Sequence, residues 1–216
     1  MAGRTAFIID GFNVYHSLVE ASSSLGLVDE RGTKWLDLRS LCKSYLPLFG
    51  RDATLAGVYY FSAVARHLQA SKPGVAARHE YYAKVLRLTG VSVEMSSFKP
   101  KRTKCRVCGK PSKTYVEKET DVAVAVKVLE IFHVRSADRV VLMTGDTDVA
   151  PAVRAARRMF PSNEVSFAFP WNRSREELSK LVQTPCISMS REVYVAHQFP
   201  DPLVIGNRSF AKPPSW

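Results

Sequence analysis

Short apolar runs alternate with helical patterns along most of the chain, and this alternation limits the fold more than any other feature. The helical patterns separate strand-like runs at residues 5–10, 53–61, 91–98, 139–145 and 164–169. Strands that alternate with helices form βαβ units, whose strands run parallel beneath a cover of helices. The sequence therefore predicts an α/β fold with a central, mostly parallel sheet and helices on both faces.

The length of 216 residues suits one domain with a small insertion. We expect this domain to span residues 1–199, with the insertion at about 99–116. From residue 200 the chain is rich in proline and polar residues, so residues 200–216 are predicted to form a loosely ordered tail.

One predicted helix, residues 121–132, begins at an aspartate that is considered below as a candidate site residue. Thr120 is a candidate N-cap, because threonine side chains accept hydrogen bonds from the first helical turn. Helical spacing predicts one apolar face made of Val122, Ala125, Val126, Leu129 and Phe132.

Isolated acids occur where the predicted strands end. Asp10 ends the first strand, and Asp146 and Asp148 follow another strand; Asp121 begins the helix described above. In parallel sheets, ligands bind at the carboxyl ends of the strands. Asn13, about one turn after Asp10, can present an amide oxygen or a hydrogen bond to the same place.

Several carboxylates gathered at one edge repel one another unless cations lie among them, and Mg²⁺ and Mn²⁺ take oxygen ligands. Helix capping explains any one of these acids alone, but the four aspartates together favour a metal site. A metal there can activate water for attack at phosphorus. Glu117 and Glu119 are weaker candidates, because acids beside Lys118 are also expected to face solvent.

The charge of the chain indicates a polyanionic partner, with nucleic acid as the first candidate. Lys and Arg number 31 against 20 Asp and Glu, which gives a net charge of +11. The charge concentrates in the insertion, at Lys99, Lys101, Arg102, Lys104, Arg106, Lys110 and Lys113. These side chains are predicted to hold phosphates, and a flexible solvated hairpin is the alternative. Arg173 and Arg175 are candidates to extend this phosphate track.

Two cysteines in the insertion, Cys105 and Cys108, are followed by Gly109, which is the form of a zinc knuckle. A knuckle supplies two of the usual four ligands. The others are expected from a histidine, from Cys42 or Cys186, or from a second subunit in a homodimer. A redox pair is the alternative to zinc.

The start of the chain lacks the apolar core of a secretory signal. No run reaches the ~18 apolar residues that cross a bilayer. We therefore expect a cytoplasmic protein without a membrane partner.

Three blocks of sequence together resemble the NYN domain family, a branch of the PIN-like nucleases. They are IIDGFNVYH (8–16), EKETDVAVAV (117–126) and MTGDTDVAPAVRAAR (143–157), and they follow one another in family order. The resemblance implies an α/β/α sandwich and metal-dependent cleavage of RNA by Asp10, Asp121, Asp146 and Asp148. Asn13 matches the asparagine of the first family block.

The sequence thus predicts a ribonuclease, with endonuclease as the first form, that uses Mg²⁺ or Mn²⁺. The alternative is a non-catalytic RNA-binding or regulatory module that keeps the PIN-like fold. Four retained aspartates favour the enzyme, since a binding module has no chemical need for acids that repel one another. A nucleotide hydrolase is disfavoured because the chain lacks a G-x-x-x-x-G-K-[ST] loop.

Overall fold

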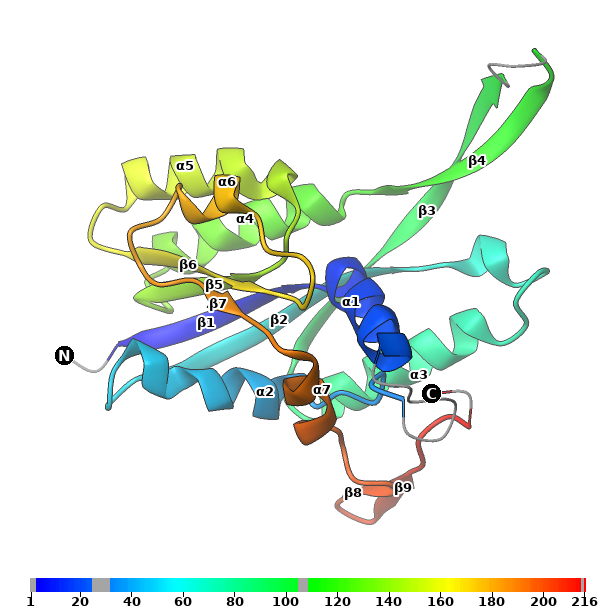
Figure 1. The fold of residues 1–216 in the computed structure, drawn as a ribbon, viewed down its shortest axis with the longest axis horizontal. Coiled ribbons are helices and arrows are strands. Elements are labelled where there is room, and N and C mark those ends of the chain that lie inside the picture. The colour runs from blue at the N-terminus through cyan, green and yellow to red at the C-terminus, as the bar shows by residue number, and fades with distance from the viewer. Residues whose placement is uncertain (1–2, 25–31, 105–108, 215) are drawn as a thin grey trace.

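The computed structural model describes residues 3–24, 32–104, 109–214 and 216. These residues form a sheet of seven strands in the order β4-β3-β2-β1-β5-β6-β7 (Figure 1). All neighbouring strands are parallel except β3 and β4. The strands are β1 (Arg4–Asp10), β2 (Thr54–Val64), β3 (Ser92–Lys104), β4 (Pro111–Lys118), β5 (Arg139–Met143), β6 (Glu164–Phe169) and β7 (Ile187–Ser188). The predicted mostly parallel sheet is confirmed.

Helices cover both faces of the sheet, as predicted (Figure 1). One face is covered by α1 (Gly11–Ser24), α2 (Leu38–Tyr45), α3 (Val75–Leu88) and α7 (Arg191–Ala196). The other face is covered by α4 (Thr120–His133), α5 (Ala150–Met159) and α6 (Glu176–Ser179). Short 3₁₀ turns follow several of these elements, at η2 (Leu46–Phe49), η3 (Arg66–Leu68) and η4 (Thr147–Val149). Among the described residues, no helix combines the length and apolarity that crossing a membrane requires.

Strand β1 shows how the sequence builds the two layers. Phe7 and Ile9 lie in the core beneath α1, whereas Ala6 and Ile8 lie in the core beneath α4. Successive side chains of a strand point to opposite faces, so an uninterrupted apolar run fills both cores at once.

Helix α1 begins directly after β1, which places Asp10 at the junction. At Gly11, an added Cβ would lie 2.6 Å from the Tyr60 ring and 2.8 Å from the Phe61 carbonyl oxygen. Only glycine allows α1 to start this close to β2.

The predicted basic insertion is the outer part of a long antiparallel ribbon. β3 and β4 pair from Ser97 opposite Lys118 to Lys104 opposite Pro111, and they project away from the body (Figure 1). The strand predicted to end at Phe98 therefore continues to Lys104.

The predicted face of α4 is correct at Phe132, which is buried in the core beneath this helix, and wrong towards the start of the helix. The side chains of Val122 and Val126 are 66% and 56% exposed, and the buried positions include Val124, Val128 and Ile131. Thr120 is the first helical residue, and the N-cap position belongs to Glu119. Residues 122–126 are all Val or Ala, so spacing alone could not distinguish the two faces.

The segment predicted as a loosely ordered tail also differs. It contains a hairpin of β8 (Leu203–Ile205) and β9 (Arg208–Phe210), and Phe210 and Trp216 are buried in the core beneath α1. Tyr81 donates a hydrogen bond to the Ala211 carbonyl, 3.1 Å away. Two aromatic side chains thus anchor a stretch whose proline and polar content indicated disorder.

Candidate active site at the carboxyl edge of the sheet

Asp10 is held at the centre of the carboxyl edge by four hydrogen bonds. Its Oδ1 accepts from the backbone N–H groups of Phe12 and Asn13, both at 3.0 Å. Its Oδ2 accepts from Asn13 Nδ2 at 2.9 Å and Thr144 Oγ1 at 2.8 Å. Only 9% of Asp10 is exposed, and this burial raises the pKa of its carboxyl although the hydrogen bonds oppose the shift.

A second set of hydrogen bonds shapes the loop after β5. Asn13 Oδ1 accepts from the Gly145 N–H at 3.1 Å, and Thr144 Oγ1 accepts from the Asp146 N–H at 3.0 Å. Asp146 Oδ1 in turn accepts from the Asp148 N–H at 3.0 Å and caps η4. Asn13 and Thr144 therefore join the first and third sequence blocks into one site.

The structure brings the four predicted aspartates together. Partial burial raises the pKa of Asp121, and the charges of Asp146, Asp10 and Asp148 raise it further. Asp148 is exposed at the rim. No described Lys, Arg or His forms an ion pair with any of the four. The cluster is thus a concentration of negative charge without its own cations.

Glu117 on β4 joins this cluster, although its sequence context made it a weak candidate. Burial raises the pKa of Glu117, the polar side chain of Thr120 opposes this shift, and the charges of Asp10 and Asp121 make smaller contributions that raise it. Its buried Oε1 has no hydrogen-bond partner among the described residues. Glu119 differs, because it faces solvent and pairs with Lys99 at 2.9 Å. Strand alternation would have kept both acids on one face, because they are two residues apart. They separate because Glu119 lies beyond β4, at the N-cap of α4 with a left-handed φ of 83°, which no local sequence pattern indicated.

The donor atoms of this cluster fit a hard divalent cation. They are all carboxylate oxygens, and the unpaired Oε1 of Glu117 is a buried acceptor that a cation would satisfy. As they stand, no three His, Cys, Asp or Glu side chains of the described residues are arranged to hold a metal ion. Ion binding would therefore need shifts of these side chains.

Comparison with known proteins assigns the family. The sequence profile of the NYN domain matches residues 4–184, which is most of the chain. The chain belongs to the NYN domain family. This family is a branch of the PIN-like nucleases, which typically depend on divalent metal ions.

One solved structure supports this fold. A crystal structure of a protein of unknown function from Vibrio parahaemolyticus aligns with a TM-score of 0.52 at 16% identity, over 88% of this chain and 95% of that chain. MurG from Acinetobacter baumannii aligns with a TM-score of 0.37 at 10% identity, over 93% of this chain and 44% of that chain, which is too weak to indicate a shared fold. No curated protein matches the chain.

The basic residues of this NYN domain divide between two faces of the β3–β4 ribbon. Paired residues on neighbouring strands share a face, and successive residues alternate. His67 contacts both Phe98 and Tyr115 with ring centroids 4.5 Å apart, which fixes one face. We call it the aromatic face; along it lie Glu117, Phe98, Tyr115, Arg102, Lys113 and Lys104. Lys99 and Lys101 lie on the opposite face.

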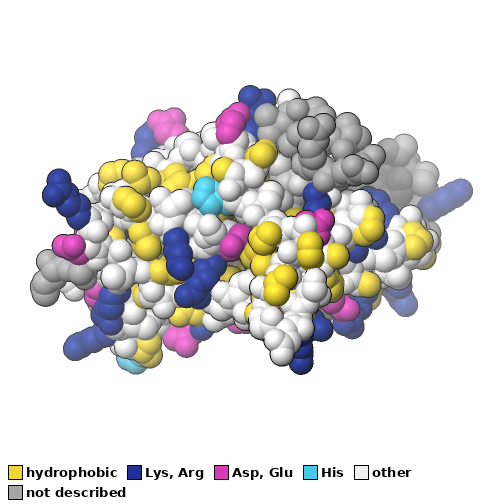
Figure 2. All heavy atoms as spheres, turned by 90° about the horizontal axis from the view of Figure 1, so that it is seen from below, with side chains coloured by type: hydrophobic (Ala, Val, Ile, Leu, Met, Phe, Trp, Pro, Cys, Tyr) yellow, Lys and Arg dark blue, Asp and Glu magenta, His cyan; other side chains and the backbone are white. Residues whose placement is uncertain are grey.

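Arg102 and Lys113 lie directly opposite each other across the ribbon. Like charges in this position destabilise a strand pair, so an anion between them would stabilise the ribbon. On the face shown in Figure 2, Lys and Arg side chains are scattered among polar and hydrophobic atoms.

Two further predicted arginines lie away from this ribbon. Arg173 forms an ion pair with Glu20 on α1, and its backbone packs against Gly145. Arg175 is the N-cap of α6. Lys110 is an exposed residue just before β4. Arg106, Cys105 and Cys108 lie outside the described residues. Cys42 and Cys186 are free thiols, and burial raises the pKa of Cys42 well above its usual range.

Proposed function

We propose that this NYN domain is a metal-dependent endoribonuclease that hydrolyses phosphodiester bonds in RNA. The observation that carries the proposal is the cluster of unpaired carboxylates at the carboxyl edge of a parallel sheet, in a chain whose net charge is +11. A polyanion does not approach such a cluster unless cations lie between them. Family membership supports the same chemistry.

Asp10, Asp121, Asp146 and Asp148 would hold Mg²⁺ or Mn²⁺, with Glu117 as a further ligand. When bound, such an ion lowers the pKa of water and neutralises charge on the scissile phosphate. Asn13 and Thr144 keep Asp10 and the Asp146 loop in place through hydrogen bonds. The aromatic face of the ribbon leads from Glu117 to Arg102, Lys113 and Lys104, so these side chains would bind phosphates next to the cleaved bond.

The second candidate is an RNA-binding module without catalysis. It is favoured by Asp10, whose two oxygens already accept four hydrogen bonds from the chain. An acid satisfied in this way can serve the fold alone.

Incubation of labelled RNAs with Mn²⁺, Mg²⁺ or EDTA distinguishes the two candidates. We expect cleavage that needs the metal and is lost in Asp146→Asn. A circular RNA tests internal cleavage, because it has no ends and must open to a linear product. Salt-sensitive binding without cleavage under any metal would establish the binding module instead.

Three further predictions accompany this function. Zinc at Cys105 and Cys108 is tested by the metal content of the purified protein, before and after Cys105→Ser. A homodimer is tested by light scattering across a range of concentrations. The cytoplasmic location is tested by fractionation of cells that express the chain.

A further inference from the structure

A cavity of about 420 Å³ lies beside the acid cluster. Gly11 and Phe12, which directly follow Asp10, form part of its wall, and so does Tyr60. Burial raises the pKa of Tyr60 to about 12, and the charges of Asp10 and Glu117 contribute to the shift. Because Gly11 and Phe12 directly follow Asp10, the cavity adjoins the candidate active site.

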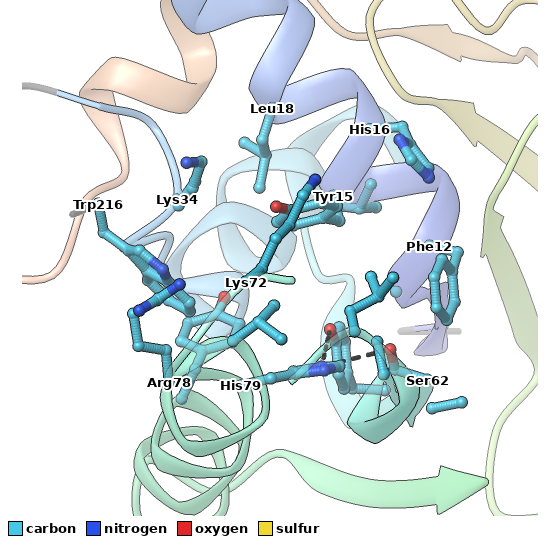
Figure 3. Close-up of a pocket in the computed structure, with 18 of the residues that line it drawn as sticks. Phe12, Tyr15, His16, Leu18, Lys34, Ser62, Lys72, Arg78, His79 and Trp216 are labelled. Atoms are coloured by element: carbon cyan, nitrogen blue, oxygen red, sulfur yellow. Dashed lines mark hydrogen bonds between the residues drawn. The ribbon is translucent and has the colours of Figure 1, made fainter. Parts of the chain in front are cut away.

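Three cationic side chains give the cavity a positive character that suits an anion, whereas burial lowers the pKa of His79 and favours its neutral form. Lys34, Lys72 and Arg78 line it together with His16, His67 and His79, and no Asp or Glu is present among the described lining residues. Lys72 makes no side-chain hydrogen bond or ion pair with another described residue. Figure 3 shows Lys72 extended towards Tyr15 on α1, and Arg78 beside Trp216.

The remaining wall is largely aromatic. Phe12 and Phe98 meet edge to face with centroids 5.5 Å apart, and His67 packs against Phe98 at 4.5 Å. His79 Nε2 lies 3.4 Å from both Tyr60 Oη and Ser62 Oγ, which supplies polar atoms on an otherwise apolar surface (Figure 3). Aromatic surface with a few polar atoms is what a nucleobase needs for stacking and edge recognition.

We propose that this cavity binds one unstacked nucleotide of single-stranded RNA, next to the bond that is cleaved. The base would occupy the aromatic interior, and Lys72 would contact its phosphate at the mouth. Small-ligand pockets measure roughly 300–1,000 Å³, so the cavity admits one nucleotide. A base within a duplex is stacked and paired, and it cannot enter without leaving the helix. This inference rests on the proposed function and adds that the substrate is unpaired at the site.

Binding of a ten-nucleotide single strand in EDTA tests the proposal without cleavage. Lys72→Ala removes one charge from the cavity. Lys84→Ala is the matched control, because Lys84 is an exposed residue of α3 outside the lining. We expect Lys72→Ala to weaken single-strand affinity roughly fivefold to tenfold and Lys84→Ala less than about twofold. Affinity for a blunt duplex should be equal in the two variants.

Photo-crosslinking locates the bound base independently. An RNA with a single 5-iodouridine, moved one position at a time, should crosslink at one position to a peptide that contains Phe12, Tyr15 or His67. Crosslinks confined to the ribbon, or equal affinities of the two lysine variants, would overturn the inference while leaving cleavage intact.

A free mononucleotide shares the chemistry of this ligand, so uridine monophosphate is the third arm. If it binds in a Lys72-dependent manner and the oligonucleotide does not, the cavity is a mononucleotide site and the inference is wrong. If the parent protein neither binds nor cuts RNA, the proposed function itself fails.

Discussion

The acids at the two ends of the parallel strands differ in their ion pairs. At the amino edge, Asp138 pairs with Arg4 at 2.9 Å and Glu164 accepts a hydrogen bond from Arg139 at 2.7 Å. At the carboxyl edge, no described Lys, Arg or His forms an ion pair with the five acids of the cluster, which are Asp10, Glu117, Asp121, Asp146 and Asp148. Arginines thus neutralise the acids at the amino edge (the compensated edge), whereas the acids at the carboxyl edge have no such partner among the described residues (the uncompensated edge).

Their pKa values follow this difference. Hydrogen bonds from Arg4 lower the pKa of Asp138, whereas burial raises the pKa of Asp10 and Asp121, which neighbouring acids raise further. A compensated acid favours the folded state, and an uncompensated cluster opposes it until a ligand supplies positive charge. This difference supports the proposed function, in which the amino edge stabilises the fold and the carboxyl edge binds metal and RNA.

The largest expected difference between the two edges is in the rate of RNA cleavage after the same Asp→Asn substitution. Asp146→Asn removes one carboxylate from the proposed metal site, and we expect the cleavage rate to fall about a hundredfold or more. Asp138→Asn removes the same charge from the amino edge and should leave the rate within about twofold. Rates on labelled RNA in Mn²⁺ measure both. Equal rates for the two variants would remove the functional difference between the edges.

RNA affinity in EDTA should respond in the opposite direction. Asp146→Asn is expected to bind RNA as tightly as the parent protein or more tightly, because it removes negative charge near the phosphates. A clear loss of affinity would instead indicate that the variant is misfolded.

Divalent ions should stabilise the protein through the carboxyl edge alone. An ion at about a hundred times its Kd adds ~2.7 kcal/mol, which raises the melting temperature by about 5 °C or more. We expect Mn²⁺ to produce this shift in the parent protein and in Asp138→Asn, but a much smaller one in Asp146→Asn. Melting curves with Mn²⁺ and with Ca²⁺ measure it. An equal shift in all three proteins would place the ion elsewhere.

The basic side chains that bind RNA beside the acid cluster are expected on the aromatic face of the β3–β4 ribbon. Arg102→Ala with Lys113→Ala removes two charges from the aromatic face, and Lys99→Ala with Lys101→Ala removes two from the opposite face. We expect RNA affinity to fall about tenfold in the first pair and about threefold in the second. The slope of log affinity against log salt should change more in the first pair. Equal losses would mean that the ribbon acts only through its net charge.

The smallest effect is the stability contributed by the amino edge. The pKa of Asp138 is lowered in the folded state, so its contribution is complete above the ordinary value near 3.8 and is lost as the pH falls through the lowered pKa. Asp138→Asn should therefore reduce the free energy of unfolding by less than about 1 kcal/mol at neutral pH. The difference should shrink at about pH 3. Urea unfolding at both pH values measures it, and a difference that grows in acid would contradict this account.

The sequence predicted the features that depend on residues adjacent along the chain. The apolar run before Asp10 fixed a buried strand, and the strand-to-helix step placed Asp10 at the carboxyl edge, as the structure has it. The nearness of Asp10 and Asp146 followed from parallel order, because β1 and β5 are parallel neighbours whose ends meet at one edge. Asp121 reaches the same place through the antiparallel return of β4, which the sequence did not show.

The missed features depend on contacts between distant segments. Glu117 enters the cluster because β4 pairs with β3, and Phe210 and Trp216 are buried because a core formed by earlier elements accepts them. The buried face of α4 was likewise decided by its neighbours, since valine occurs on both sides of the helix. No pattern within one segment contains this information.

β4 is also the last strand of its sheet, and its outer edge has backbone groups that no described strand pairs with. Such an edge can join the sheet of another molecule and begin aggregation, and charged side chains are one means by which proteins prevent it. Lys113 and Lys118 lie on this strand and Lys110 directly precedes it. Lys110 and Lys113, which were predicted to hold phosphates, would therefore also protect this edge from aggregation, so variants that neutralise them should be handled at low concentration.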